Sequence, residues 1–251
     1  MREGKGRLCF WLFVFGISVA FFHILPALLT RYLAWPLSWG DMLDFLTPFA
    51  IIPLATILYF QSQRIIDSTS NHRQGQPSLK ILTKIIIAFG FLCYAEGHGL
   101  HLSANSIARL LVNMKESDVY RATYLYDEVI SHFIWIIGLF LISVALLLIA
   151  SKHLHMSLSG QNYSFLFAGA AAYGFAFTLE AIEGQTVIFT FPAAGAGFLL
   201  AFLFCWKKRR EGFQNPVLLF FIAAYLLSLL LFLSWGVSHS GFPQFSELGW
   251  I

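Results

Sequence analysis

Residues 128–151 read EVISHFIWIIGLFLISVALLLIAS, an apolar run long enough to cross a bilayer as an α-helix. Six more apolar runs of similar length occur at residues 8–30, 43–62, 80–101, 163–183, 187–206 and 217–238. These runs are continuously apolar, whereas the strands of membrane barrels alternate apolar and polar residues. The sequence therefore predicts an all-α polytopic membrane protein, a bundle of about seven transmembrane helices that forms a single domain over residues 1–251.

The composition supports a membrane location. Of the 251 residues, 58% are hydrophobic and 12% are charged, and the mean hydropathy is +0.71. A soluble domain carries about 25% charged residues, so most of this surface must face something other than water. We expect membrane lipids as partners, and no nucleic acid.

Basic residues predict the orientation. Twelve of the 16 Lys and Arg residues fall at the N-terminus or in the connections after the second, fourth and sixth runs. By the positive-inside rule these segments are cytoplasmic. We therefore expect a multi-pass protein of the cell membrane with a cytoplasmic N-terminus and a non-cytoplasmic C-terminus. Ten of the 13 Asp and Glu residues lie on the opposite side, a bias that the rule does not explain.

Two longer connections separate the runs. Residues 63–79 are polar with Gly and Pro, which is typical of a loop. Residues 106–126 are amphipathic, with apolar residues at helical spacing. That segment is either an interfacial helix over the non-cytoplasmic face or an ordinary connecting loop.

The third run ends in EGHGLHLSAN at residues 96–105. His98, His101 and Asn105 are spaced i, i+3 and i+7, so they share one face of a helix. Two imidazoles at this spacing can bind one metal ion, whereas the alternative is a hydrogen-bonded pair at a helix end. Gly97 and Gly99 leave room for a neighbouring helix or a ligand.

The fourth run begins with acidic residues followed by a histidine. Glu128 and His132 are spaced i and i+4 and would share a helical face. Asp127 is either a capping residue or a partner of Ser131 on the adjacent face. His132 lies about one turn inside the apolar run, where capping does not account for it.

The fifth run ends with Glu180 and Glu183, two carboxylates at the unfavourable end of the helix dipole. Their mutual repulsion would be relieved by a bound cation or a shared proton, or by free hydration. His239 ends the last run, whereas His23 lies within the first run and is expected to be structural.

The alternating direction of the runs puts these groups at one membrane depth. Ionisable residues inside membrane segments are costly and usually functional. His and carboxylate donors together suit zinc or iron. We therefore expect a divalent metal site with Glu128 and Glu183 as catalytic carboxylates. The expected ligands are His98, His101, His132, Glu180 and His239. His72, His153 and His155 fall in polar loops and are given no role.

Three function classes follow. The first is a metal-dependent membrane enzyme, a hydrolase acting on a lipid-like substrate near the non-cytoplasmic face. The second is a proton- or cation-coupled transporter that uses the same groups as a path. The third is a non-catalytic metal-binding membrane subunit. The one-sided position of the groups favours the first class, because transporter sites usually lie near the bilayer midplane.

Overall fold

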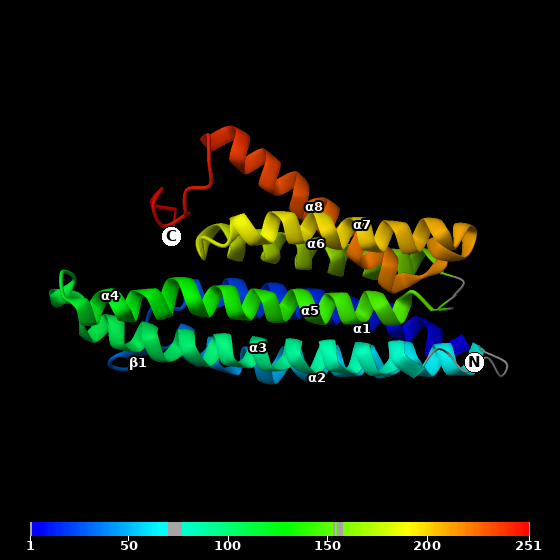
Figure 1. The fold of residues 1–251 in the computed structure, drawn as a ribbon, viewed down its shortest axis with the longest axis horizontal. Helices are drawn as coiled ribbons and strands as arrows, with labels where there is room; N and C mark the ends of the chain where they lie inside the picture. The colour runs from blue at the N-terminus through cyan, green and yellow to red at the C-terminus, as the bar shows by residue number, and fades with distance from the viewer. Residues whose placement is uncertain (1, 70–76, 153, 155–157, 251) are drawn as a thin grey trace.

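The computed structural model describes residues 2–69, 77–152, 154 and 158–250, and Figure 1 shows that helices make up most of this chain. The seven long helices are α1 (Arg2–Leu28), α2 (Trp39–Thr69), α3 (Pro77–Leu110), α5 (His132–Ala150), α6 (Gly160–Glu183), α7 (Val187–Lys207) and α8 (Pro216–His239). The all-α prediction is confirmed. His72, His153 and His155 lie outside the described residues.

Among the described residues, six helical segments have the length and composition needed to cross a membrane. They are α1, α2, α6, α7, α8 and the continuous helix Asp118–Ala150 that contains α5. The remaining long helix, α3, has 34 residues. The described part of the chain is therefore compatible with a polytopic helical protein embedded in a membrane.

The connection between α3 and α5 differs from both sequence-based alternatives. α3 continues to Leu110, and a short helix, α4 (Asp118–Tyr124), begins soon afterwards. Ser117 caps α4, because its hydroxyl oxygen accepts a hydrogen bond from the Tyr120 backbone N–H at 3.2 Å. α4 then leads through a π-helical segment, Leu125–Ser131, directly into α5. Asp127 therefore lies inside a continuous helix, and the capping alternative for it is wrong.

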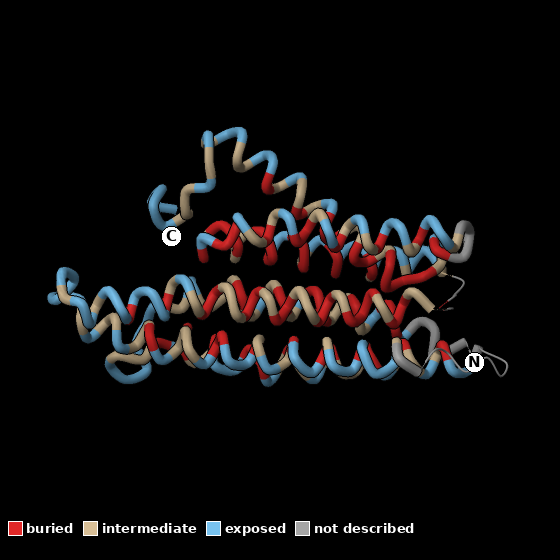
Figure 2. Tube along the Cα trace, viewed as in Figure 1, coloured by how far each residue is buried: buried red, intermediate tan, exposed pale blue. Residues whose placement is uncertain are grey.

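The helices pack mainly as neighbouring pairs. α3 lies along α5, α1 lies along α6 and α2, and α8 packs against α6 and α7. Glycine permits the closest of these approaches: a Cβ on Gly16 would lie 2.6 Å from the carbonyl carbon of Gly169. Figure 2 shows that residues are buried where helices face one another and exposed on their outer sides.

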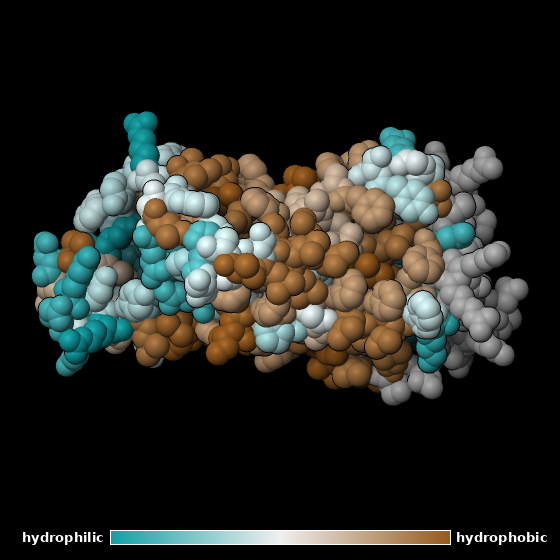
Figure 3. All heavy atoms as spheres, turned by 90° about the horizontal axis from the view of Figure 1, so that it is seen from above, coloured by the Kyte–Doolittle hydropathy of each residue, from teal (hydrophilic) through white to brown (hydrophobic). Residues whose placement is uncertain are grey.

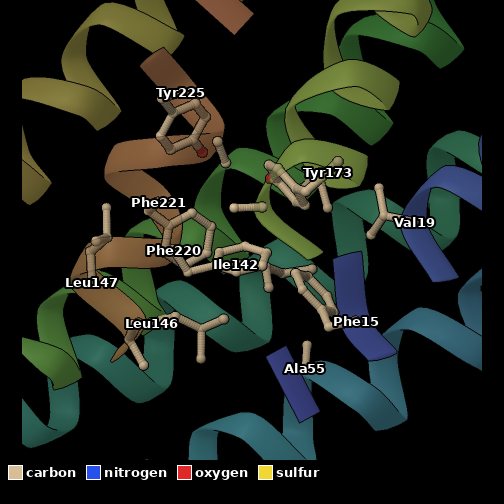
Figure 4. Close-up of a cluster of buried hydrophobic side chains, with 14 of the residues drawn as sticks. Phe15, Val19, Ala55, Ile142, Leu146, Leu147, Tyr173, Phe220, Phe221 and Tyr225 are labelled. Carbon is tan, nitrogen blue, oxygen red and sulfur yellow. The ribbon is translucent and has the colours of Figure 1, made fainter. Parts of the chain in front are cut away.

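Aromatic and aliphatic side chains fill the middle of the bundle (Figure 4). Tyr173 is fully buried, and its hydroxyl group is 2.8 Å from the Ser143 hydroxyl oxygen. Phe15, Phe220 and Tyr225 pack around the Tyr173 ring, with centroids 5.8 to 6.2 Å away. This core lies between the two ends of the bundle.

The surface matches a bilayer environment. Figure 3 shows an apolar band between the hydrophilic residues at the left-hand end and those near the right-hand end. Near the left-hand end of Figure 1, a two-stranded antiparallel hairpin, β1 (Tyr32–Ala34) and β2 (Leu37–Ser38), connects α1 to α2. The end of α6 and the start of α5 lie at this same end of the bundle.

Candidate functional site

Buried ionisable side chains gather at the end of the bundle that carries the β hairpin. They come from the last turns of α1, the first turns of α2, the second half of α3, the π-helical segment with the start of α5, and the end of α6. The buried members are His23, Asp41, Asp44, His98, Asp127 and His132, and the half-buried ones are His101, Glu128, Glu180 and Glu183. Ionisable side chains from separate helices therefore lie together at one end of the bundle.

One carboxylate–histidine pair joins α2 to α3. The Nδ1–H of His98 donates to Oδ1 of Asp44 at 2.8 Å, and the His98 side chain is 1% exposed. The other two polar atoms of the pair, Nε2 of His98 and Oδ2 of Asp44, are buried without a hydrogen-bond partner among the described residues. A buried imidazole fixed through one nitrogen and unpartnered at the other has the arrangement of a metal ligand oriented by a carboxylate.

A second pair joins α3 to the π-helical segment. Nδ1 of His101 lies 2.9 Å from Oδ1 of Asp127, at an ion-pair distance without the alignment of a good hydrogen bond. The His101 ring also faces the His132 ring, with centroids 5.0 Å apart. Nδ1 of His132 is buried and has no hydrogen-bond partner among the residues that the structure describes.

The π-helical segment changes which side chains share a face. The spacing of Glu128 and His132 predicts a common face of an α-helix, but Leu125–Ser131 is π-helical. The backbone hydrogen bonds of a π-helix join residues five apart rather than four. In this segment Asp127 therefore also lies on the side of His132. Both side chains are buried against His101, and Asp127 was missed as a site residue because the sequence carries no clear sign of a π-helix.

His23 is held through both ring nitrogens, which supports the structural role expected for it. Nδ1–H donates to the Val19 carbonyl oxygen at 2.8 Å, and the Tyr94 hydroxyl group lies 3.1 Å from Nε2. The Trp135 ring lies among the site histidines, with its centroid 4.2 Å from that of His98 and 5.5 Å from that of His101. It is therefore in contact with both carboxylate–histidine pairs.

A cavity of about 280 Å³, here called the polar chamber, opens beside these pairs. His101, Glu128, His132 and Glu180 line one part of it, and Arg109 lines another. Neither Glu128 nor Glu180 has a hydrogen bond or an ion pair with another described residue. Two carboxylates without a protein partner thus face a cavity that a ligand could occupy.

The Arg109 side of the chamber is a closed structural network. The Arg109 guanidinium group pairs with Asp41, and Asn105 Nδ2 donates to Asp41 Oδ1 at 3.1 Å. Asp41 also accepts from the backbone N–H and the hydroxyl group of Ser38 in β2, at 2.6 and 2.8 Å. This network fixes the hairpin over the chamber and leaves Asp41 fully occupied.

Glu183 and His239 do not join the histidine pairs. Glu183 lines the chamber, but its Oε2 accepts the backbone N–H groups of Phe245 and Ser246 at 2.8 and 3.3 Å. His239 stacks on Trp235 with ring centroids 3.9 Å apart. His239 is also absent from the chamber lining in the described part of the chain.

The donor atoms fit a divalent ion in part. Among the described residues, no set of three or more His, Cys, Asp and Glu is already gathered as a metal-binding group. The His101 and His132 rings are nevertheless at the roughly 5 Å separation that two imidazoles with bonds of about 2.1 Å to one zinc ion would show. The buried nitrogens of His98 and His132 that have no partner among the described residues are donors of the type that zinc binds.

Fold and site together define a helical, membrane-embedded candidate protein with a buried histidine–carboxylate centre at one end. Comparison with protein-family models, with curated proteins and with solved structures finds no significant match. The function is therefore inferred from the chemistry of the site itself.

Gly97 sets the approach of α3 to α5 at this site. A Cβ there would lie 2.6 Å from Trp135 Cβ and 2.8 Å from the Ser131 carbonyl oxygen. We expect Gly97→Ala to lower the free energy of unfolding by about 1–3 kcal/mol through overpacking. Gly99→Ala is the matched control, because nothing lies within 4 Å of its Cβ position. Thermal unfolding in one detergent compares them, and equal midpoints would show that the close approach is not needed.

Proposed function

We propose that this protein is a metal-dependent membrane hydrolase whose site faces the non-cytoplasmic side. One observation carries the proposal: buried His98 is fixed by Asp44 through Nδ1 while its Nε2 has no partner among the described residues. Leaving a buried polar atom unpaired costs free energy, and a bound metal would remove that cost. In this proposal all seven long helices, α3 included, span the cell membrane as a single domain with a cytoplasmic N-terminus.

Three histidines would hold the ion. His101 and His132 already face each other, and His98 is the third imidazole. Asp44 and Asp127 would act as orienting partners behind His98 and His101, a role that metal-bound histidines usually require. Glu180 would complete the site or balance its charge, and zinc or iron suits this mixture of nitrogen and oxygen donors.

The chemistry uses the polar chamber. A divalent ion held there would activate a water molecule and polarise a carbonyl or phosphoryl oxygen. Glu128 faces the chamber without a described partner, so it is free to take the proton from that water as general base. The Arg109–Asp41–Asn105 network closes the opposite wall and keeps the substrate's polar group near Glu128. The substrate would be lipid-like, because the chamber lies at the headgroup level of the proposed bilayer.

The transporter alternative is less well supported. It requires a polar path from the chamber to the other end of the bundle. The packed core beneath the chamber is built from Phe15, Tyr173, Phe220, Phe221 and Tyr225, all of them fully buried. A site confined to one end of such a core suits a reaction at one membrane face.

Metal analysis of the purified protein tests the proposal. The expected result is about one zinc or iron ion per chain together with chelator-sensitive hydrolysis of lipid esters or amides. Metal-free protein that stays active in a strong chelator would contradict the proposal, and the site would then be a proton relay. Bound metal without turnover on any such substrate would indicate the non-catalytic metal-binding subunit instead.

The proposed orientation gives a separate prediction. A reporter fused after Ile251 should read as non-cytoplasmic, and one inserted at position 74, outside the described residues, should read as cytoplasmic. The reason is the gathering of basic residues near the N-terminus and in the connections that precede α3, α6 and α8. Paired phosphatase and fluorescent-protein fusions make the measurement. A cytoplasmic C-terminus would mean that an even number of helices crosses the bilayer.

A further inference from the structure

An apolar groove of about 440 Å³ adjoins the polar chamber. Its walls come from α1, α6 and α8, with Ile24, Phe175 and Leu231 among the lining residues. Figure 1 shows why space exists here: the C-terminal half of α8 leans away from the other helices. The groove and the chamber share four lining residues, which are His23, Ala27, Glu180 and Glu183.

The C-terminal segment covers this groove. Residues 240–250, here called the strap, return from α8 toward the bundle, and Phe245 and Trp250 line the groove. Trp235 holds the strap from α8, because its indole N–H donates to the Pro243 carbonyl oxygen at 3.2 Å and its ring packs on Phe245 at 4.7 Å.

α6 holds the strap from the other side. Glu183 accepts the Phe245 and Ser246 backbone N–H groups, and Gln244 bonds to the Gln185 side chain at 2.8 Å. A groove open only to bulk lipid would need no such cover. The strap therefore gives the groove a defined wall of its own.

We infer that the groove binds the single apolar chain of an amphiphile whose polar head enters the chamber. This inference rests on the proposed function and specifies its substrate class. The groove and the chamber meet at their shared lining residues, Glu180 among them, so apolar walls lie directly beside polar walls, which is the arrangement that a chain attached to a polar head requires. A cavity of this size lies in the lower half of the roughly 300–1,000 Å³ typical of small-molecule sites, which suits one chain better than two.

Charge in the chamber restricts the head. Glu128 and Glu180 lack partners among the described residues, and the one arginine of the lining, Arg109, is already paired with Asp41. The chamber lining also includes Asp44 and Glu183, so five carboxylates stand against one arginine, and their formal negative charge exceeds the positive charge of Arg109 and a divalent ion together. An anionic head would meet like charge, so the amphiphile carries a neutral or cationic head.

A second apolar groove, of about 350 Å³, lies between α2 and α3 and reaches His98. It is lined by Phe45, Pro48, Phe49 and Gly99 among others, and it has no lining residue in common with the polar chamber. A chain bound there lacks the shared lining residues by which the first groove adjoins the chamber. This groove is therefore the comparison site for the test.

Photocrosslinking in phosphatidylcholine nanodiscs tests the inference. The probe is hexadecyltrimethylammonium with a diazirine at the chain end, and peptide mass spectrometry maps the adducts. The expected adducts lie at residues 24–28, 175–182 and 231–235 and on the strap. Adducts spread over all lipid-facing helices, or concentrated between α2 and α3, would overturn the assignment. A hexadecyl sulfate probe should label the groove at least about tenfold less, and equal labelling would overturn the charge restriction.

Matched variants sharpen the test. Leu231→Trp fills the groove and should reduce labelling there by about tenfold or more, because the chain loses apolar burial. Leu230→Trp is the control, since Leu230 is 56% exposed and lies outside the groove lining. Gly99→Phe fills the comparison groove and should leave labelling unchanged. If Gly99→Phe blocks labelling and Leu231→Trp does not, the chain binds in the groove between α2 and α3 instead.

The outcomes separate this inference from the proposed function. Groove labelling on a protein that holds no metal and hydrolyses nothing would retain the inference and reject the hydrolase. Metal-dependent hydrolysis that is insensitive to Leu231→Trp, with scattered adducts, would retain the hydrolase and reject the groove.

Discussion

Alanine in place of His98, His101 or His132 should remove the bound metal and abolish hydrolysis, which is the largest effect expected for any single change in this protein. The His101 and His132 rings face each other with centroids 5.0 Å apart, and His98 and His132 each keep a buried nitrogen without a described partner, so the proposed metal site takes its donors from these three residues. The loss of metal affinity should exceed the roughly 10–100-fold that follows removal of an orienting partner. Metal content after gel filtration, measured by mass spectrometry, gives the result.

Two kinds of control belong with these variants. Asp44→Asn keeps the shape of the side chain but weakens the hold on His98, so it should reduce metal affinity by about 10–100-fold. His239→Ala should retain the metal, because His239 stacks on Trp235 outside the chamber lining of the described residues. If His98→Ala, His101→Ala and His132→Ala all retained the metal, the shared site would be contradicted. If His239→Ala lost the metal, His239 would have to be counted among the ligands.

Glu128→Gln should lower kcat by about 10²–10⁴-fold while the metal stays bound. The amide keeps the size of the side chain but cannot accept the proton from the attacking water. Single-turnover hydrolysis with metal-loaded protein is the measurement, and normal turnover would exclude Glu128 as the base.

The two α6 carboxylates provide the comparison for Glu128→Gln. Glu180→Gln should change metal content as well as rate, because Glu180 faces the chamber without a described partner. Glu183→Gln should instead loosen the strap, since its carboxylate accepts two backbone N–H groups there. If Glu180→Gln kept full metal content and full activity, Glu180 would have no role in the metal site.

The helices were predictable because each apolar run is continuous and long. The runs at 163–183, 187–206 and 217–238 correspond closely to α6, α7 and α8. The region between residues 106 and 126 was not predictable to the same degree. α3 continues there and a capped α4 follows, although neither segment is apolar enough to be recognised by hydropathy. Local capping by Ser117, rather than a hydrophobic signal, sets the boundary.

The site was predictable in part. Shared depth and spacing led to His98, His101, Glu128, His132 and Glu180, and these residues do gather around the polar chamber or directly behind it. Their partners could not be found that way. The pairing of Asp44 with His98 links positions 54 residues apart, and it depends on how α2 packs against α3. No spacing within a single segment carries such information.

The helices α4 and α5 are joined by the π-helical turn Leu125–Ser131, whose hydrogen bonds span one residue more than those of the helices on either side. If the same residues ran as a regular α-helix, Asp127 and His132 would be five positions apart at about 100° per residue, and they would point about 140° apart around the axis. Asp127 could no longer face His101 while His132 faced it too. The centre therefore depends on an irregular turn of the helix as well as on its histidines, because a straight helix with the same histidines would separate Asp127 from His132.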